Sequence, residues 1–173
     1  MRQILVIILL SFLLVSCVGT NASSDFVNLR TKLAESLVKW KSFKNEHDAT
    51  YEYVTSYSGN SPPNKTVITV EKDTIVKRVH YQTINLQKLE DSQVWIEDSP
   101  ETLGKNSTLK KVDDYYDECS AILDYAEANS SDSNIFASVS FDSNGLISNC
   151  GDGAVVYDDG SHTFQILKIA PIL

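Results

Sequence analysis

Three cysteines are the residues of this 173-residue chain whose chemistry is easiest to anticipate, namely Cys17, Cys119 and Cys150. A thiol can be lipidated, can be oxidised to a disulfide, or can serve as a redox or nucleophilic group. A redox or nucleophilic thiol is expected in a Cys-x-x-Cys motif or at a basic helix start, and neither Cys119 nor Cys150 has such surroundings. The segments that carry each cysteine therefore decide its role.

The N-terminal segment is a short positive head followed by an apolar run. Arg2 supplies the charge, and the run over residues 4–15 is about twelve residues long and broken only by Ser11. It is too short to span a bilayer, which needs about 20 apolar residues. The run is also apolar on every side, whereas a helix that packs on the core from the surface keeps one polar face. This disfavours the alternative of an N-terminal core helix. Residues 1–16 are therefore predicted to be a signal peptide.

The residues that close this run are Leu14-Val15-Ser16-Cys17. They resemble the lipobox of bacterial lipoproteins. The resemblance implies cleavage before Cys17 and lipidation of its thiol, so that the chain binds the membrane through Cys17. Two or more acyl chains anchor a protein stably, whereas one is marginal. Because Val18 stands where an Asp commonly marks inner-membrane retention, the resemblance favours the periplasmic face of the outer membrane.

The main alternative is an ordinary secreted protein that is cleaved further on, for example after Ala22. Asn-x-Ser/Thr triplets match the N-glycosylation acceptor pattern, although such triplets also arise by chance in a chain rich in Ser, Thr and Asn. They begin at Asn21, Asn64, Asn106 and Asn129.

Size and charge restrict the remaining possibilities. Removing the signal peptide leaves about 157 residues, which fits a lipidated Cys and flexible tether over 17–24 and one domain over 25–173. The chain carries 15 Lys and Arg against 23 Asp and Glu, a net charge of −8. Phosphate backbones and anionic headgroups repel such a domain, so we expect no nucleic-acid partner and a membrane attachment that depends on lipid.

With Cys17 assigned to the anchor, Cys119 and Cys150 are left as a pair in a protein that meets an oxidising compartment. The even count predicts a disulfide. It would close a loop of about 32 residues, for which the chain-entropy model gives about 3.5 kcal/mol.

Hydrophobic periodicity predicts an α+β fold, an antiparallel sheet with two helices packed on it in the order helix, strands, helix, strands. One helix is expected from Ser24 or Asp25 to about Phe43, and another over 112–128 with Cys119 in its apolar stripe. We expect two αβββ-like halves, each with a helix against a sheet, and Cys119 meeting Cys150 within the second half. The expected strands cover 50–57, 67–71, 74–86, 93–96, 135–141, 146–150, 154–157 and 163–169. Lys72-Asp73 is expected to be the short loop of an antiparallel hairpin, and Gly151-Asp-Gly153 is expected to be a turn between two short strands.

Four motifs lie along these elements: Trp40, Tyr51-x-Tyr53, the run from Asp114 to Cys119, and the run from Val139 to Cys150. Together they resemble a family of small exported bacterial proteins classed only as a domain of unknown function. The resemblance covers most of residues 25–170. It implies the fold and the pairing of Cys119 with Cys150, but no activity.

The sequence predicts no catalytic residues, no metal site and no cofactor. His47, His80 and His162 are scattered, and H-E-x-x-H, G-x-S-x-G and Gly-rich phosphate motifs are absent. His80 is expected to be an exposed strand residue, and Asp158-Asp159 is expected to form a turn and not a cation site.

Tyrosines on neighbouring predicted strands are a candidate binding surface, provided that their sheet face is open. The alternative is that the apolar stripe of the first helix covers them. The tyrosines are Tyr51, Tyr53, Tyr57 and Tyr81.

These observations favour a membrane-anchored, non-enzymatic binding or structural module of the cell envelope, with an envelope protein as its expected partner. The alternatives are an inhibitor-like or chaperone-like module acting on a periplasmic enzyme, a secreted glycoprotein domain, and a small hydrolase whose site has no recognisable motif.

Overall fold

The computed structural model describes residues 21–57, 64–85, 90–105, 108–131, 135–154 and 163–172. The predicted signal peptide and Cys17 lie outside these residues, as does the Asp158-Asp159 turn with His162.

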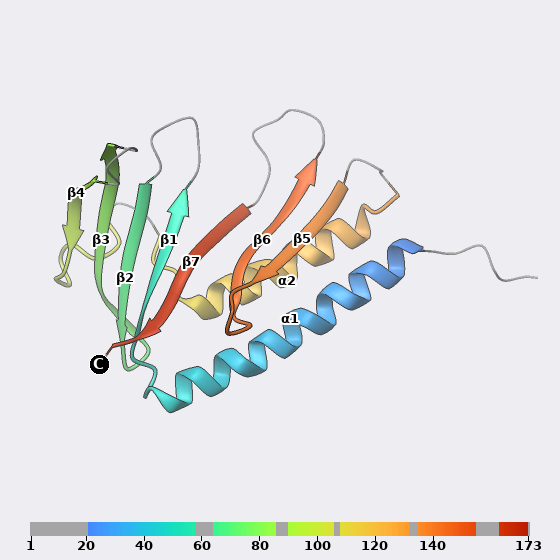
Figure 1. Ribbon diagram of the computed structural model, residues 1–173, viewed down its shortest axis with the longest axis horizontal. Helices are drawn as coiled ribbons and strands as arrows, with labels where there is room; N and C mark the ends of the chain where they lie inside the picture. The colour runs from blue at the N-terminus through green and yellow to red at the C-terminus, as the bar shows by residue number, and fades with distance from the viewer. Residues whose placement is uncertain are drawn as a thin grey trace, which may run out of the picture.

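One seven-stranded antiparallel sheet organises the molecule, with the strand order β4-β3-β2-β1-β7-β6-β5 (Figure 1). The predicted α+β class is confirmed. The strands are β1 (Tyr51–Tyr57), β2 (Asn64–Glu71), β3 (Thr74–Asn85), β4 (Glu90–Glu97), β5 (Ile135–Phe141), β6 (Ile147–Ala154) and β7 (Thr163–Pro171).

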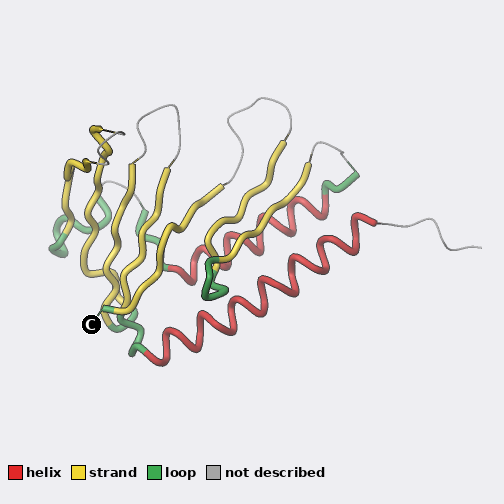
Figure 2. The backbone as a smooth tube through the Cα atoms, viewed as in Figure 1, coloured by secondary structure: helices red, strands yellow, loops and turns green. Residues whose placement is uncertain are grey.

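Two helices, α1 (Asn21–Glu46) and α2 (Val112–Ala128), pack together on one face of this sheet (Figure 2). We call this the inner face and the opposite one the outer face. The bounds of α2 are those predicted, while α1 begins earlier, so that residues 21–24 are helical instead of part of the expected tether. In the described part of the chain, neither helix is long and apolar enough to cross a membrane.

The expectation of two separate halves needs correction. β1 pairs with β7, which joins both sets of strands into one sheet. Helix α1 precedes the first set, yet it packs against β5 and β6 of the second. The reason is that the inner face of β5 is apolar, through Ile135, Ala137 and Val139, whereas β3 presents Arg78 and His80 on that face. An amphipathic helix gains free energy where it covers apolar surface.

The prediction of two short strands around a Gly151-Asp-Gly153 turn is wrong. β6 runs through this segment without interruption, and Gly151 pairs with Ser138 of β5 and with Thr163 of β7. Glycine has a low preference for strands, but pairing with β5 on one side and β7 on the other keeps Gly151 in the sheet. Residues 155–157, which we expected in the second of these strands, lie outside the described residues.

The predicted disulfide between Cys119 and Cys150 is confirmed and joins α2 to β6. The S–S distance is 2.03 Å and the two Cα atoms lie 5.6 Å apart. Both cysteines are fully buried in the hydrophobic cluster between the helices and the sheet. A bond at this place fixes the helix layer to the middle of the second set of strands.

A buried hydrogen-bond hub lies close to this disulfide. The Tyr116 hydroxyl lies 2.7 Å from Ser36 Oγ and accepts a hydrogen bond from the backbone N–H of Ile147 at 3.1 Å. It thereby connects α2 to both α1 and β6. Buried polar groups with satisfied hydrogen bonds specify one packing arrangement, so the hub fixes how the two helices sit on the sheet.

A candidate binding cleft on the inner sheet face

A cleft lies on the inner face beside the start of α2. It consists of two adjoining hollows of about 100 Å³ and 220 Å³, which share Thr55, Thr66, Lys110 and Tyr115 as lining residues. We call these hollows together the polar cleft. Arg78 and Thr108 also line the smaller hollow, and His80, Glu118 and Gln165 also line the larger one.

The strand register explains why this part of the sheet is polar. Side chains on paired residues of neighbouring strands share a face, so the inner face is built of rows that cross the strands. One row is Tyr51 and Val70, the next is Tyr53, Ile68, Arg78 and Glu97, and the third is Thr55, Thr66, His80 and Trp95. The face therefore changes from apolar to polar along the strands.

Arg78 and Glu97 form a buried ion pair in the second row. Arg78 Nη1 lies 3.1 Å from Glu97 Oε2, and the two side chains are 6% and 1% exposed. Glu97 also accepts a hydrogen bond from the Gly104 backbone N–H at 2.9 Å, and the guanidinium lies 5.2 Å from the ring centre of Trp95. Breaking such a pair leaves an uncompensated buried charge, so this pair holds the floor of the polar cleft in place.

His80 lies in the third row between a hydroxyl and an aromatic ring. Its Nδ1 is 3.0 Å from Thr66 Oγ1, and its ring stacks on Trp95 with centroids 5.1 Å apart. Burial and the positive charge of Arg78 lower the pKa of His80 below its ordinary value. The imidazole is therefore neutral at pH 7. Its partly buried position also differs from that of the exposed strand residue that we expected.

The Thr66–His80 pair resembles one part of a nucleophilic site, namely a hydroxyl next to a base. A hydroxyl becomes a nucleophile when an adjacent base takes its proton, and that base is usually oriented by a third group. Within the described residues, no carboxylate is hydrogen-bonded to the His80 ring. The pair can donate hydrogen bonds to a ligand and accept hydrogen bonds from it.

Lys110 and Tyr115 form the rim of the polar cleft. Lys110 Nζ lies 2.8 Å from Glu118 Oε2, and the Tyr53 hydroxyl donates a hydrogen bond to the Lys110 carbonyl. Burial and the negative charge of Glu118 raise the pKa of Tyr115 to about 12. The pKa of Tyr53 is also raised, mainly by burial. Both phenols are therefore protonated at neutral pH. The cleft thus presents hydroxyl groups to a ligand, while Arg78 and Lys110 are each paired with a glutamate.

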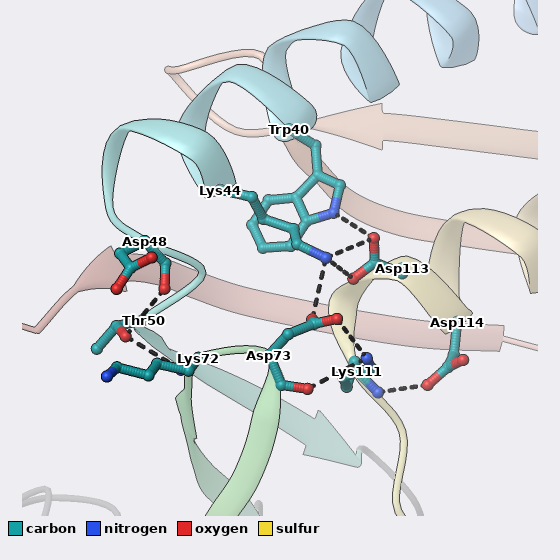
Figure 3. Close-up of polar contacts among 9 residues, drawn as sticks. All are labelled: Trp40, Lys44, Asp48, Thr50, Lys72, Asp73, Lys111, Asp113 and Asp114. Atoms are coloured by element: carbon teal, nitrogen blue, oxygen red, sulfur yellow. Dashed lines mark hydrogen bonds and ion pairs between the residues drawn. The ribbon is translucent and has the colours of Figure 1, made fainter.

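A second cluster, the polar junction, positions that rim (Figure 3). We define it as Trp40, Lys44, Asp73, Lys111 and Asp113. Lys44 Nζ lies 3.0 Å from both Asp73 and Asp113, while Lys111 Nζ lies 3.0 Å from Asp73. Trp40 Nε1 donates to Asp113 at 3.1 Å. The junction thus ties the end of α1 and the β2–β3 turn to the start of α2.

The β2–β3 turn explains how a carboxylate reaches this junction. Lys72 and Asp73 are its two central residues, with φ angles of 47° and 65°, the left-handed values of a type I′ hairpin turn. The turn is held by the Asp73 N–H, which donates to the Ala49 carbonyl at 3.0 Å, and by the Lys72 N–H, which donates to Thr50 Oγ1. The hairpin predicted around Lys72-Asp73 is confirmed.

The predicted tyrosine surface is not assembled as one face. Tyr51 and Tyr53 are buried in the core, 0% and 1% exposed, where Trp40 of α1 and Tyr115 of α2 contact them. The alternative that a helix covers them is the one found. Tyr81 pairs with Lys65 on the outer face, because side chains alternate along a strand. The side chain of Tyr57 lies outside the described residues.

Among the residues that line the polar cleft, the sequence drew attention to Tyr53 and His80, but it did not indicate that they share one cleft. The available signal was the spacing Arg78-x-His80, which puts two basic side chains on the same face of one strand. Within the described residues, no group of three or more His, Cys, Asp or Glu side chains is arranged to hold a metal ion.

Comparisons with known protein families, with curated proteins and with solved structures found no match for this chain. The geometry of the cleft and the sequence of the N-terminus are therefore the grounds on which a function can be argued.

Proposed function

We propose that this chain is an exported, lipid-anchored protein of the bacterial cell envelope, and that its polar cleft binds an uncharged, polar segment of another envelope protein. It acts in this proposal as a binding module and not as an enzyme. The observation that carries the proposal is the polar third row of the inner face, with its hydroxyl, imidazole and aromatic groups, next to the rim formed by Lys110 and Tyr115.

The size of the cleft favours a protein segment over an enclosed small molecule. Pockets that enclose drug-sized ligands typically measure about 300–1,000 Å³, and the two hollows together reach only the lower end of that range. Two small adjoining hollows suit successive side chains of a bound segment. His80, which stacks on Trp95, and Tyr115 supply aromatic rings to the lining of the cleft, and aromatic side chains often anchor interfaces.

The electrostatics of the cleft favour an uncharged segment. Arg78 is paired with Glu97 and Lys110 with Glu118, so a charged ligand would have to compete with an existing ion pair. A neutral His80 and protonated Tyr115 leave hydrogen bonding as the main polar interaction.

Matched substitutions on the two faces of β2 test this proposal. Thr66→Arg fills the polar cleft, whereas Thr69→Arg places the same side chain on the outer face of the same strand. Cells carrying each full-length variant are cross-linked, and the proteins joined to it are quantified by mass spectrometry. We expect one envelope protein to be captured by the wild type and by Thr69→Arg, and at least tenfold less by Thr66→Arg.

Equal capture by the two variants would show that the cleft is not the binding surface. A substrate that the purified protein turns over, with activity lost in His80→Ala, would instead support the hydrolase alternative. Thermal unfolding of both variants serves as the folding control.

A further inference from the structure

β4 and β5 form the two edges of the seven-stranded sheet (Figure 1). The residue composition of these two strands differs. The edge strand β4 contains Glu90, Asp91 and Glu97 and has two register shifts against β3. Charges and bulges are the usual means by which natural proteins prevent an edge from pairing with another strand. The edge strand β5 reads Ile-Phe-Ala-Ser-Val-Ser-Phe and has no charged residue, no proline and no glycine.

The side chains of β5 alternate as those of a well-formed strand do. Ile135, Ala137 and Val139 are half-buried and pack against the core, while Phe136 and Ser138 are exposed. Phe136 is 52% exposed. The described chain pairs β5 with β6 on one side. An uncharged strand of seven residues at a sheet edge is a template for a further strand.

We infer that β5 pairs antiparallel with β5 of a second copy of this chain, around a two-fold axis at Ser138. In this register Ile135 lies opposite Phe141 of the second copy, and Ala137 lies opposite its Val139. Both of these pairs lie on the inner face and extend the apolar surface beneath the helices. On the outer face Phe136 lies opposite Ser140, and Ser138 lies opposite itself.

The self-complementary register is the reason for assigning a second copy as the partner. An antiparallel two-fold interface requires the same strand to match its own reversed sequence, and the inner face of β5 does so, because only apolar side chains lie opposite one another there. This inference is independent of the polar cleft, which lies over β1, β2, β3 and β7 and not over β5.

Charge sets the expected salt dependence of this dimer. Each copy has a net charge of −8, but the paired strand carries none of it. The repulsion is therefore long-range, and ions screen it beyond about 8 Å at physiological ionic strength. We expect the dimer to become tighter as the salt concentration rises.

Matched lysine substitutions on the two edges test the inference. Ser138→Lys places two lysines opposite each other at the two-fold axis, and Ser92→Lys makes the same change at an exposed position of β4. The full-length protein is extracted in detergent, and its mass is measured by sedimentation at chain concentrations up to about 1 mM. We expect the wild type and Ser92→Lys to be dimers and Ser138→Lys to associate at least tenfold more weakly.

A wild type that stays monomeric over this range would overturn the inference, as would equal weakening by both lysine variants. Ser138→Cys gives a second readout if the lysine variant fails to fold. It should form a disulfide-linked dimer under oxidation beyond the level of the wild type, whereas Ser92→Cys should not. A linked species that contains a different protein would show that another chain, and not a second copy, pairs with β5.

Discussion

At the scale of single residues, two tyrosines of β1 have different polar surroundings. The Tyr53 hydroxyl donates to the Lys110 carbonyl. The Tyr51 hydroxyl is fully buried and lies toward the backbone of Val112, but it makes no hydrogen bond of ordinary geometry with the described residues. Burial raises the pKa of both phenols, so neither ionises in the neutral range.

This difference predicts opposite effects for the same substitution. Removing a hydroxyl that has a partner costs about 1 kcal/mol, whereas removing one without a partner is nearly neutral or stabilising. We expect Tyr53→Phe to lower the free energy of unfolding by about that amount and Tyr51→Phe to leave it unchanged or to raise it. Urea unfolding of the two variants measures both values. Equal destabilisation would mean that Tyr51 has a hydrogen-bond partner in solution.

The same residues show what a single sequence can and cannot give. Cys119 and Cys150 could be paired because only two cysteines remain after Cys17 is assigned to the anchor. Arg78, His80 and Thr66 could not be placed in one cleft, because their association depends on the register between β2, β3 and β4. A shift of one residue in that register would turn each side chain to the other face.

At the scale of elements, the polar junction links three of them through one carboxylate. Burial would raise the pKa of Asp73, but its hydrogen bonds to Lys44 and Lys111 outweigh that effect, so its pKa is lowered. A lowered carboxyl pKa contributes stability above the ordinary value near 3.9, and the contribution is lost as the pH falls through the lowered pKa. For Lys44, burial would lower the pKa, but hydrogen bonds to Asp113 and Asp73 raise it. Its contribution is therefore present below about pH 10.4 and lost as the pH rises through the raised pKa.

Asp73→Asn isolates this charge, because Asn suits the left-handed turn position as well as Asp does. Asp73 is 45% exposed, so we expect a loss of at most about 1 kcal/mol. The loss should be present at pH 6, should shrink as the pH falls below the ordinary carboxyl pKa near 3.9, and should vanish once the pH is below the lowered pKa of Asp73. Thermal unfolding between pH 2 and pH 7 measures it, with Asp98→Asn as the control at an exposed carboxylate outside the junction. A difference that persists at pH 2 would point to the turn geometry and not to the charge.

Elements with strong local signals were predictable, and those that depend on distant pairing were not. The bounds of α2 follow from its apolar stripe at three- and four-residue spacing, and the β2–β3 hairpin follows from its short loop. β6 was misread as two strands, because Gly151 and Gly153 resemble a turn and the strands on both sides of β6 are not evident from local sequence.

At the scale of the whole molecule, the anchor proposed at Cys17 and the described domain are separated by few residues in the sequence. Helix α1 begins at Asn21, so three residues separate it from Cys17. Three extended residues span about 10 Å. The anchor proposed at Cys17 would therefore hold the domain close to the bilayer surface, with little freedom to move away from it.

We expect Cys17→Ser to move the protein from the membrane fraction to the soluble fraction, because loss of the acyl chains removes about 0.8 kcal/mol of membrane affinity for each buried CH₂. Fractionation of cells and intact-mass analysis of the mature N-terminus measure this. Val18→Ser is the control, since it changes the neighbouring residue and keeps the thiol. Membrane attachment of Cys17→Ser equal to that of the control would contradict lipid anchoring.

The place of β7 in the sheet has a consequence for biosynthesis. β7 is the last of the seven described strands in the sequence, yet it lies between β1 and β6 and joins the two sets of strands. A nascent polypeptide cannot complete this sheet until β7 has been synthesised. For the exported protein that we propose, this order of synthesis postpones the joining of the two sets of strands and so favours delivery of the precursor to the translocation channel before it has folded.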